Sequence, residues 1–234
     1  MSHEYAQLGA ENQSLPCAWL MAVCCLAISF AITGCTVIDQ EQYDTEHTAI
    51  SLGPRDLENY GIGFLTPSAA TGREADKQAL AMNFSMKLQE MRPDVRVLSL
   101  PRVLSAVNTA DLDEQYKQIY RDYLETGILE GSILRRVSGV TDVRYFAQLS
   151  LASFTQQSKG RFSLLGLRVS QTTSGNLRVF LQIWDARQGT VAWEGSTELN
   201  YAYETGAEKP VTFQVTTQMA AKQLFSKLPG AIED

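Results

Sequence analysis

The spacing of apolar residues changes several times along the chain between the periods typical of helices and of strands. In residues 72–91 the side chains Leu80, Phe84 and Leu88 recur every four residues, as they would on one face of a helix. In residues 177–184 every second residue is aliphatic, which is the pattern of a strand with one buried face. The same criteria predict further strands at 61–65, 95–98, 128–134, 145–154 and 190–194, and further helical segments at 101–107, 112–124 and 210–228.

This order of elements predicts one α/β (α+β) domain over residues 59–230. A mixed sheet of about four to five strands, with the helices packed on it, would give each amphipathic helix a surface on which to bury its apolar stripe. Gly127 and Gly189 are expected at the end of a helix and in a hairpin turn, where positive φ angles are common.

The N-terminal segment differs sharply from this domain. Residues 15–32 carry no charge, and the run ends in Ile32-Thr33-Gly34-Cys35. This sequence resembles the lipobox of bacterial lipoproteins, in which small residues precede the cysteine that receives a diacylglycerol. The resemblance implies that Cys35 is the lipidation site and that palmitate-type acyl chains anchor the protein to a membrane. The alternative is an uncleaved transmembrane helix with an incidental cysteine.

The lipobox implies a division of the chain into a signal peptide at residues 1–34, a flexible tether at 35–58 and the envelope domain at 59–230. The signal departs from the usual pattern, because residues 1–14 contain no Lys or Arg. Residue 36 is Thr and not Asp, which by resemblance to lipoprotein sorting implies the periplasmic face of the outer membrane. His47 lies in the predicted tether, where we expect it to be solvated.

The composition of the chain excludes several classes of partner and of catalytic site. The net charge of −6 gives no basic excess of the kind that nucleic-acid binding needs, so no nucleic-acid partner is expected. All four cysteines lie at or before Cys35, and the predicted domain contains no histidine. Disulfides, Cys–His catalysis and a Ser–His–Asp triad are thereby excluded from that domain, and we expect no metal and no cofactor.

Carboxylates are the remaining catalytic candidates. They cluster at Asp111, Asp113 and Glu114, and again at Glu125 and Glu130. Paired carboxylates can hydrolyse glycosidic bonds, so a lipid-anchored hydrolase acting on cell-wall glycan or peptide is the alternative function. We favour helix caps and a solvated surface for these residues, and hence a protein that is not an enzyme.

Residues 155–175 combine polar flanks with apolar residues. An ordinary sheet strand with long loops would account for this pattern and is the simpler expectation. The functional interpretation, on which the predicted contact residues depend, is a protruding hairpin whose Phe162, Leu164, Leu165 and Leu167 contact a partner protein or a membrane. The function predicted is therefore a lipid-anchored, non-enzymatic envelope protein that binds envelope proteins, with homo-oligomerisation left open.

The order of elements also resembles a known group of envelope domains. The group comprises the curli-secretion lipoprotein, the lipoprotein activators of penicillin-binding proteins and the N-terminal domain of the Tol propeller protein. Three stretches carry the resemblance: residues 61–65 with the helix that follows, residues 123–133 (YLETGILEGSI) and residues 179–193 (VFLQIWDARQGTVAW). It implies an anticodon-binding-like fold and an outer-membrane lipoprotein, and it transfers no catalytic residue.

Overall fold

The computed structural model describes residues 38–164, 167–205 and 211–230, and their strands belong to a single sheet. In chain order the elements are β1 (Ile38–Ala49), α2 (Asp56–Tyr60), β2 (Ile62–Phe64), β3 (Ser68–Ala69), α3 (Glu74–Met91), β4 (Val97–Leu98), α4 (Leu100–Thr109), α5 (Asp113–Thr126), α6 (Gly131–Thr141), β5 (Tyr145–Leu164), β6 (Leu167–Asp185), β7 (Thr190–Thr205) and α7 (Phe213–Phe225).

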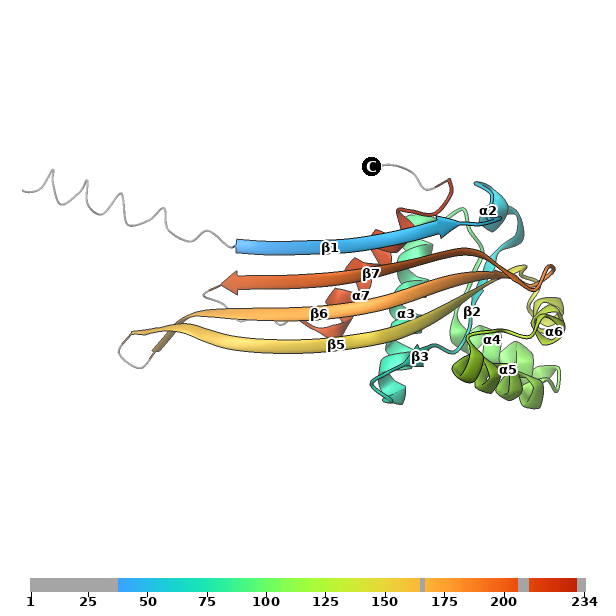
Figure 1. Ribbon diagram of the computed structural model, residues 1–234, viewed down its shortest axis with the longest axis horizontal. Helices are drawn as coiled ribbons and strands as arrows, with labels where there is room; N and C mark the ends of the chain where they lie inside the picture. The colour runs from blue at the N-terminus through green and yellow to red at the C-terminus, as the bar shows by residue number, and fades with distance from the viewer. Residues whose placement is uncertain (1–37, 165–166, 206–210, 231–234) are drawn as a thin grey trace, which may run out of the picture. The chain divides into compact units, whose positions relative to one another are not determined.

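The sheet is mixed and has seven strands. Its order is β1-β7-β6-β5-β2-β4, with β3 beside β5. The first four strands in this order are long and antiparallel (Figure 1), whereas β2 pairs in parallel with β4 and β5. The mixed α/β class is confirmed, but the expected four to five strands are wrong. The count rises because the two-residue strand β3 was not predicted and because β1 lies where a tether was predicted, whereas the strand predicted at residues 95–98 is present as β4.

Strand β1 corrects the predicted tether at residues 35–58. It pairs with β7 along its whole length, from Ile38 opposite Glu204 to Ala49 opposite Trp193. Leu52 and Leu57, which follow it, are buried in the main core. The compact unit therefore begins at Ile38 and not at residue 59. The sequence hides β1 because an edge strand buries few side chains and so lacks an apolar alternation.

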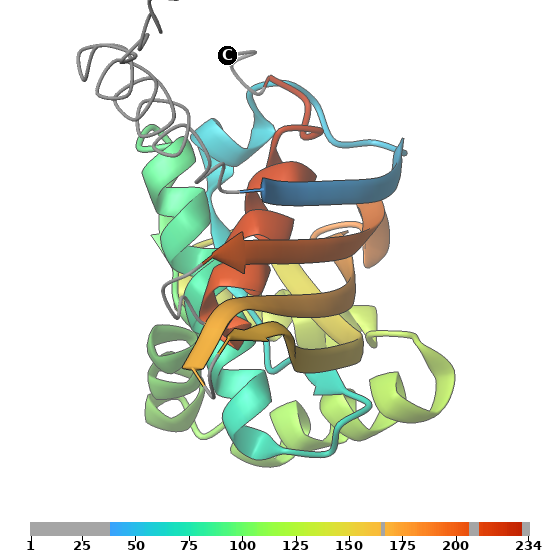
Figure 2. The ribbon, with the colours of Figure 1, turned by 90° about the vertical axis from the view of Figure 1, so that its left-hand side faces the viewer.

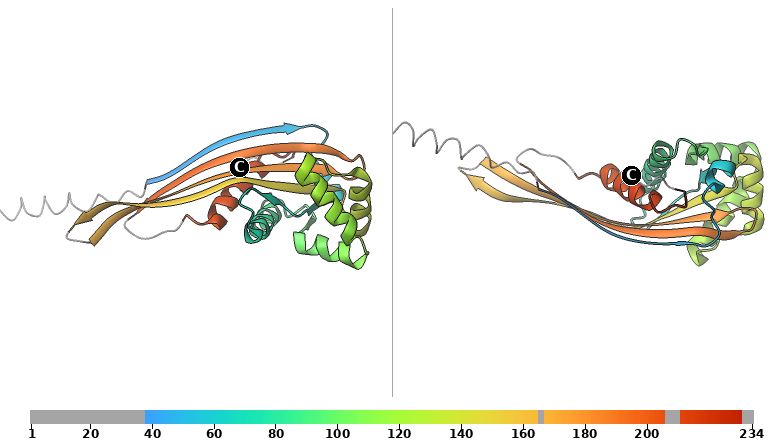
Figure 3. Two further views of the ribbon diagram at one scale, coloured as in Figure 1. Left: turned by 60° about the horizontal axis from the view of Figure 1, so that its bottom comes forward. Right: turned by 90° about the horizontal axis from the view of Figure 1, so that it is seen from above.

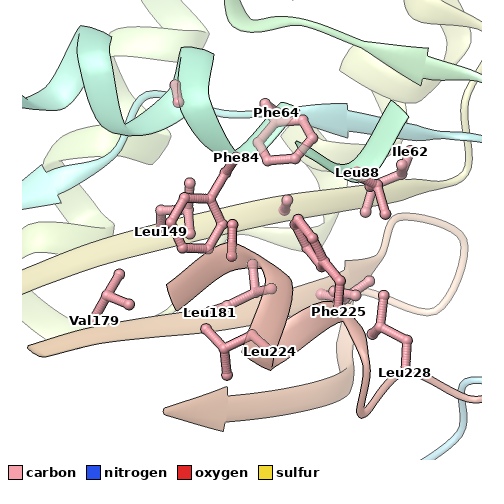
Figure 4. Packing of buried hydrophobic residues seen from close by; sticks show 14 of the residues in the cluster. Ile62, Phe64, Phe84, Leu88, Leu149, Val179, Leu181, Leu224, Phe225 and Leu228 are labelled. Atoms are coloured by element: carbon pink, nitrogen blue, oxygen red, sulfur yellow. The ribbon is translucent and has the colours of Figure 1, made fainter. Parts of the chain in front are cut away.

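Helices α3 and α7 cover one face of the long strands (Figures 2 and 4). Between helices and sheet lie large side chains that are wholly or almost wholly buried, such as Phe84 of α3, Phe225 of α7 and Leu181 of β6. The rings of Phe84 and Phe225 meet edge to face at 5.7 Å. Asn83 Nδ2 donates a 2.7 Å hydrogen bond to Thr217 Oγ1, which satisfies both polar groups in this apolar layer.

A second core lies at one end of the sheet, where α4, α5 and α6 gather (Figure 3). Because strand side chains alternate between faces, Phe146 and Trp184 point into this core while their neighbours point into the first. Leu129, Ile133 and Val137 contribute to it at helical spacing. The strand predicted at residues 128–134 is therefore wrong, because α6 begins at Gly131. The four-residue spacing of the buried side chains, and not the short apolar run, determines the secondary structure here.

Two glycines have the conformation that their predicted roles require. Gly127 ends α5 with φ 73°, and Gly189 turns the β6–β7 hairpin with φ 73°. Among the helices of the described ranges, none has the length and hydrophobicity needed to cross a bilayer.

Candidate functional site: the long hairpin, the open edges and the polar face of the sheet

The β5–β6 hairpin is the longest feature of the sheet. Its strands have 20 and 19 residues and pair from Tyr145 opposite Asp185 to Leu164 opposite Leu167. The last pair between β6 and β7 is Gln171 opposite Thr205. In Figure 1 both strands continue past the ends of β7 and β1. Residues 155–175 thus belong to a protruding hairpin, and the expected long loops are wrong for its described residues.

The predicted contact residues lie near the end of this hairpin. Phe162 and Leu164 belong to β5 and Leu167 to β6. The pairing register shifts on either side of Phe162, which bends a strand locally. Leu165 and the predicted lipidation site Cys35 lie outside the described residues. The placement of the described residues agrees with a contact role, which remains a prediction.

The base of the hairpin is held firmly by the start of α7. Phe154 of β5 meets Phe213 of α7 edge to face, with ring centroids 4.9 Å apart. A Cβ atom at Gly175 would lie 2.8 Å from Val211 Cγ1, so only glycine allows this close approach. The hairpin therefore leaves the covered part of the sheet from a packed root.

The sheet has two long open edges among the described residues. On one side, β2 and β3 occupy the edge of β5 as far as Leu151, and no described strand pairs with that edge from Ser153 to Leu164. On the other side, β1 pairs with β7 alone, so its outer edge is also open. Open edges expose unpaired backbone N–H and C=O groups, which are a template for pairing with a further strand.

The face of the long strands opposite α3 and α7 is mostly polar. Its side chains form rows across four strands, because residues opposite one another share a face. Amide and hydroxyl side chains predominate in them. The rows are Gln42–Asn200–Asn176–Thr155, Asp44–Glu198–Arg178–Ser153, Glu46–Ser196–Phe180–Ser150 and Thr48–Glu194–Gln182–Gln148.

A shallow groove of about 390 Å³ lies on this polar face, where the sheet approaches Tyr123 of α5. Phe180 lies in it and is 39% exposed, with the Arg178 guanidinium 5.4 Å from its ring centre. Glu46 and Glu194 line the same groove, and both are exposed. The groove can donate and accept hydrogen bonds, but its two carboxylates are open to water.

His47 lies on β1 and is exposed, so the expectation of a solvated side chain is confirmed, although the tether around it is wrong. Its ring stacks 6.4 Å from that of Trp193, which is fully buried on the covered face. The histidine thus lies at the margin of the core and takes no part in the polar rows.

The carboxylates proposed from the sequence do not converge on a site. Asp113 and Glu114 both accept hydrogen bonds from Lys117 on the surface of α5. Glu125 is exposed, and the exposed Glu130 accepts a hydrogen bond from Ser132. Within the described ranges, no group of three or more His, Cys, Asp or Glu residues could hold a metal ion.

A charged cluster sits at the end of the sheet opposite the hairpin tip. Arg144 donates to both carboxylate oxygens of Asp185, at 3.0 and 2.6 Å, and this raises the pKa of Arg144. The guanidinium groups of Arg144 and Arg187 each lie about 5 Å from the centre of the Tyr60 ring. Burial raises the pKa of Tyr145, whose hydroxyl donates to Asp56. This cluster ties α2 to the β6–β7 turn, so its role is structural.

Sequence reasoning missed the two features that β1 creates, which are the open outer edge of the sheet and one of the four strands of the polar face. Only Phe180, an aromatic residue at an outward position of an alternating strand, could have marked that face.

No family model and no curated protein matches the chain. Several solved structures show a weak likeness. The PelC dodecamer from Paraburkholderia phytofirmans is 9% identical with a TM-score of 0.42, covering 82% of this chain and 100% of that chain. Lipoprotein GNA1162 from Neisseria meningitidis is 11% identical with a TM-score of 0.38, covering 70% and 97%. With TM-scores below 0.5, these likenesses establish neither a shared fold nor a shared function, and the group suggested by the sequence remains a prediction.

Proposed function

We propose that this protein is a lipid-anchored, non-enzymatic component of the cell envelope that binds other proteins. The proposed location is the periplasmic face of the outer membrane, with the anchor at Cys35. The observation that carries the proposal is the β5–β6 hairpin, which extends beyond the rest of the sheet and bears Phe162, Leu164 and Leu167 near its end. Clustered apolar residues are typical of contact surfaces when they lie outside a core, and the proposal assigns that role to these three.

The packed root of the hairpin supports this function. Phe154 packs on Phe213 of α7 and Gly175 on Val211 just before it, so the strands of the hairpin are fixed where they leave the domain; a surface held in place in this way loses less entropy on binding. A few buried aliphatic side chains, at roughly 1.5–3 kcal/mol each, are enough to dominate a transient interface.

The test replaces Leu164 and Leu167 with serine in the tagged full-length chain. Partner recovery from membranes should be lost, while the thermal unfolding transition stays almost unchanged. The matched control replaces Leu124 and Ile128 with serine, since these apolar residues are 54% and 60% exposed and lie at or just after the end of α5, away from the hairpin tip (Figure 1). Loss of cooperative unfolding in the hairpin variant would place its leucines in a core and refute the proposal, as would undiminished partner recovery.

The alternative function, hydrolysis of cell-wall glycan or peptide, is favoured by one observation, the presence of Glu46 and Glu194 in the same groove. Hydrolysis of wall fragments that is lost in Glu46→Gln and Glu194→Gln variants would establish it. Their exposure argues against it, because a general acid usually needs a buried setting that keeps it protonated.

A further inference from the structure

We infer that the open edge of β1 pairs with the open edge of β5 in a second copy of this chain. The inference deepens the proposed function, on which it rests, by naming one partner and the surface that binds it. Both edges lack a described neighbour, and they lie on opposite sides of the four long strands. A contact between unlike edges therefore repeats from copy to copy in one direction.

Strand direction allows this repeat. Neighbouring strands run antiparallel from β5 through β6 and β7 to β1, so β5 and β1 of one copy also run in opposite directions. A second copy in the same orientation then places its β5 antiparallel to β1 of the first. The helix-covered faces stay on one side of the extended sheet.

The length of β1 and the position of β3 together determine the register between β1 of one copy and β5 of the next. β1 and the free stretch Ser153–Leu164 both have twelve residues, and in the register proposed below Asp39–Ala49 lies opposite Phe154–Leu164. β3 closes the edge of β5 at Leu151, so β1 of the neighbouring copy must lie entirely beyond that point. Within one copy, Thr155 lies level with Gln42. Between copies, β1 is shifted toward the hairpin tip, so that Thr48 lies opposite Thr155 with both on the polar face.

The charges of the two edges favour pairing of β1 with β5 over pairing of two β1 edges or two β5 edges. β1 carries Asp39, Glu41, Asp44 and Glu46 and no Lys or Arg, whereas the free stretch of β5 carries Lys159 and Arg161 and no acidic residue. Two β1 edges would repel each other, and so would two free β5 stretches. In the proposed register Asp44 lies opposite Lys159, and opposite charges across strands favour pairing.

The test is oxidative cross-linking in membranes with the full-length chain, in which Cys17, Cys24 and Cys25 are replaced by alanine. Thr48→Cys together with Thr155→Cys should give a ladder of dimers, trimers and larger species, since directly opposed residues lie within disulfide range. Each single variant and the parent chain should remain monomeric. A matched pair, Gln42→Cys with Thr155→Cys, reports the unshifted register and should cross-link far less.

A charge swap provides a second readout. Asp44→Lys should weaken self-association about fivefold, and adding Lys159→Asp should restore it, as expected for one pair of opposed charges. No ladder, a dimer from Thr48→Cys alone, or a stronger ladder from the unshifted pair would overturn the inference. If the ladder is absent while partner recovery still depends on Leu164 and Leu167, the proposed function stands with a different partner.

Discussion

Replacing Asp185 with Asn should destabilise the fold far more than the same change at Asp142, although each aspartate pairs with an arginine. Asp185 is 1% exposed and accepts two hydrogen bonds from Arg144. Asp142 accepts from Arg96 Nη1 at a similar distance, 2.7 Å, but its side chain is 91% exposed. The two variants therefore compare one chemical change in two solvent environments.

The expected loss of stability depends on whether the substitution leaves the partner arginine unpaired in a buried or in a solvated position. Breaking a buried pair strands a charge and costs about 3–5 kcal/mol. Arg144 keeps 18% exposure and lies over the rings of Tyr60 and Tyr145, so we expect the lower end, about 3 kcal/mol. For a domain of this size the unfolding midpoint should fall by roughly 10 °C. Asp142→Asn should cost less than about 1 kcal/mol.

The pH dependence of stability provides a second test of this prediction. Burial alone would raise the pKa of Asp185, but hydrogen bonds from Arg144 and from the backbone N–H of Arg187 hold it below its ordinary value of 3.8. A carboxyl group with a lowered pKa stabilises the fold fully above its unfolded-state pKa. This stabilisation is lost as the pH falls below about 4 and through the folded-state pKa. The Asp185→Asn variant should lack this part of the acid sensitivity.

Urea unfolding followed by tryptophan fluorescence measures both effects, at about pH 7 and in steps down to about pH 3. A chain that begins at residue 36 is suitable, because it retains β1. Equal losses for the Asp185→Asn and Asp142→Asn variants would refute the reasoning, since burial would then not set the strength of the pair.

Three further predictions follow from the fold and the anchor. A chain that begins at residue 59 should aggregate or unfold at a lower temperature than one that begins at residue 36, because it lacks β1 and the buried Leu52 and Leu57. Burial of each of these two leucines contributes roughly 1.5–3 kcal/mol to the free energy of unfolding. Size-exclusion chromatography and thermal unfolding check this. Gly195→Ala should destabilise the fold by about 1–3 kcal/mol, because its Cβ would lie 2.5 Å from Trp193 Cη2. Gly139→Ala in α6 should stabilise it by roughly 0.5–1 kcal/mol, because a Cβ there meets nothing within 4 Å. Equal effects of the two variants in urea unfolding would contradict the packing argument. Cys35→Ser should abolish labelling with a fatty-acid analogue and leave a precursor with its uncharged segment, and equal labelling of both chains would exclude Cys35 as the anchor.

The sequence alone was sufficient where a residue's neighbours lie within a few positions of it. The period of Leu80, Phe84 and Leu88 identified α3, and the alternation over residues 177–184 identified the covered part of β6. Gly127 and Gly189 marked a helix end and a turn, because positive φ is a local requirement. The contrast between the uncharged segment before Cys35 and the later domain likewise needs no tertiary structure to be noticed.

Tertiary structure decided the features whose partners lie far away in sequence. β1 is polar along most of its length, and it is a strand because β7, more than 140 positions later, supplies its hydrogen bonds. The stretch after Gly127 became α6 because Leu129, Ile133 and Val137 found a second core that no local pattern reveals. The polar rows and the open edges likewise arise from pairings among four separate segments. An edge strand satisfies only half of its backbone groups and buries few of its side chains, so its residues carry almost no signal until the sheet beside it exists.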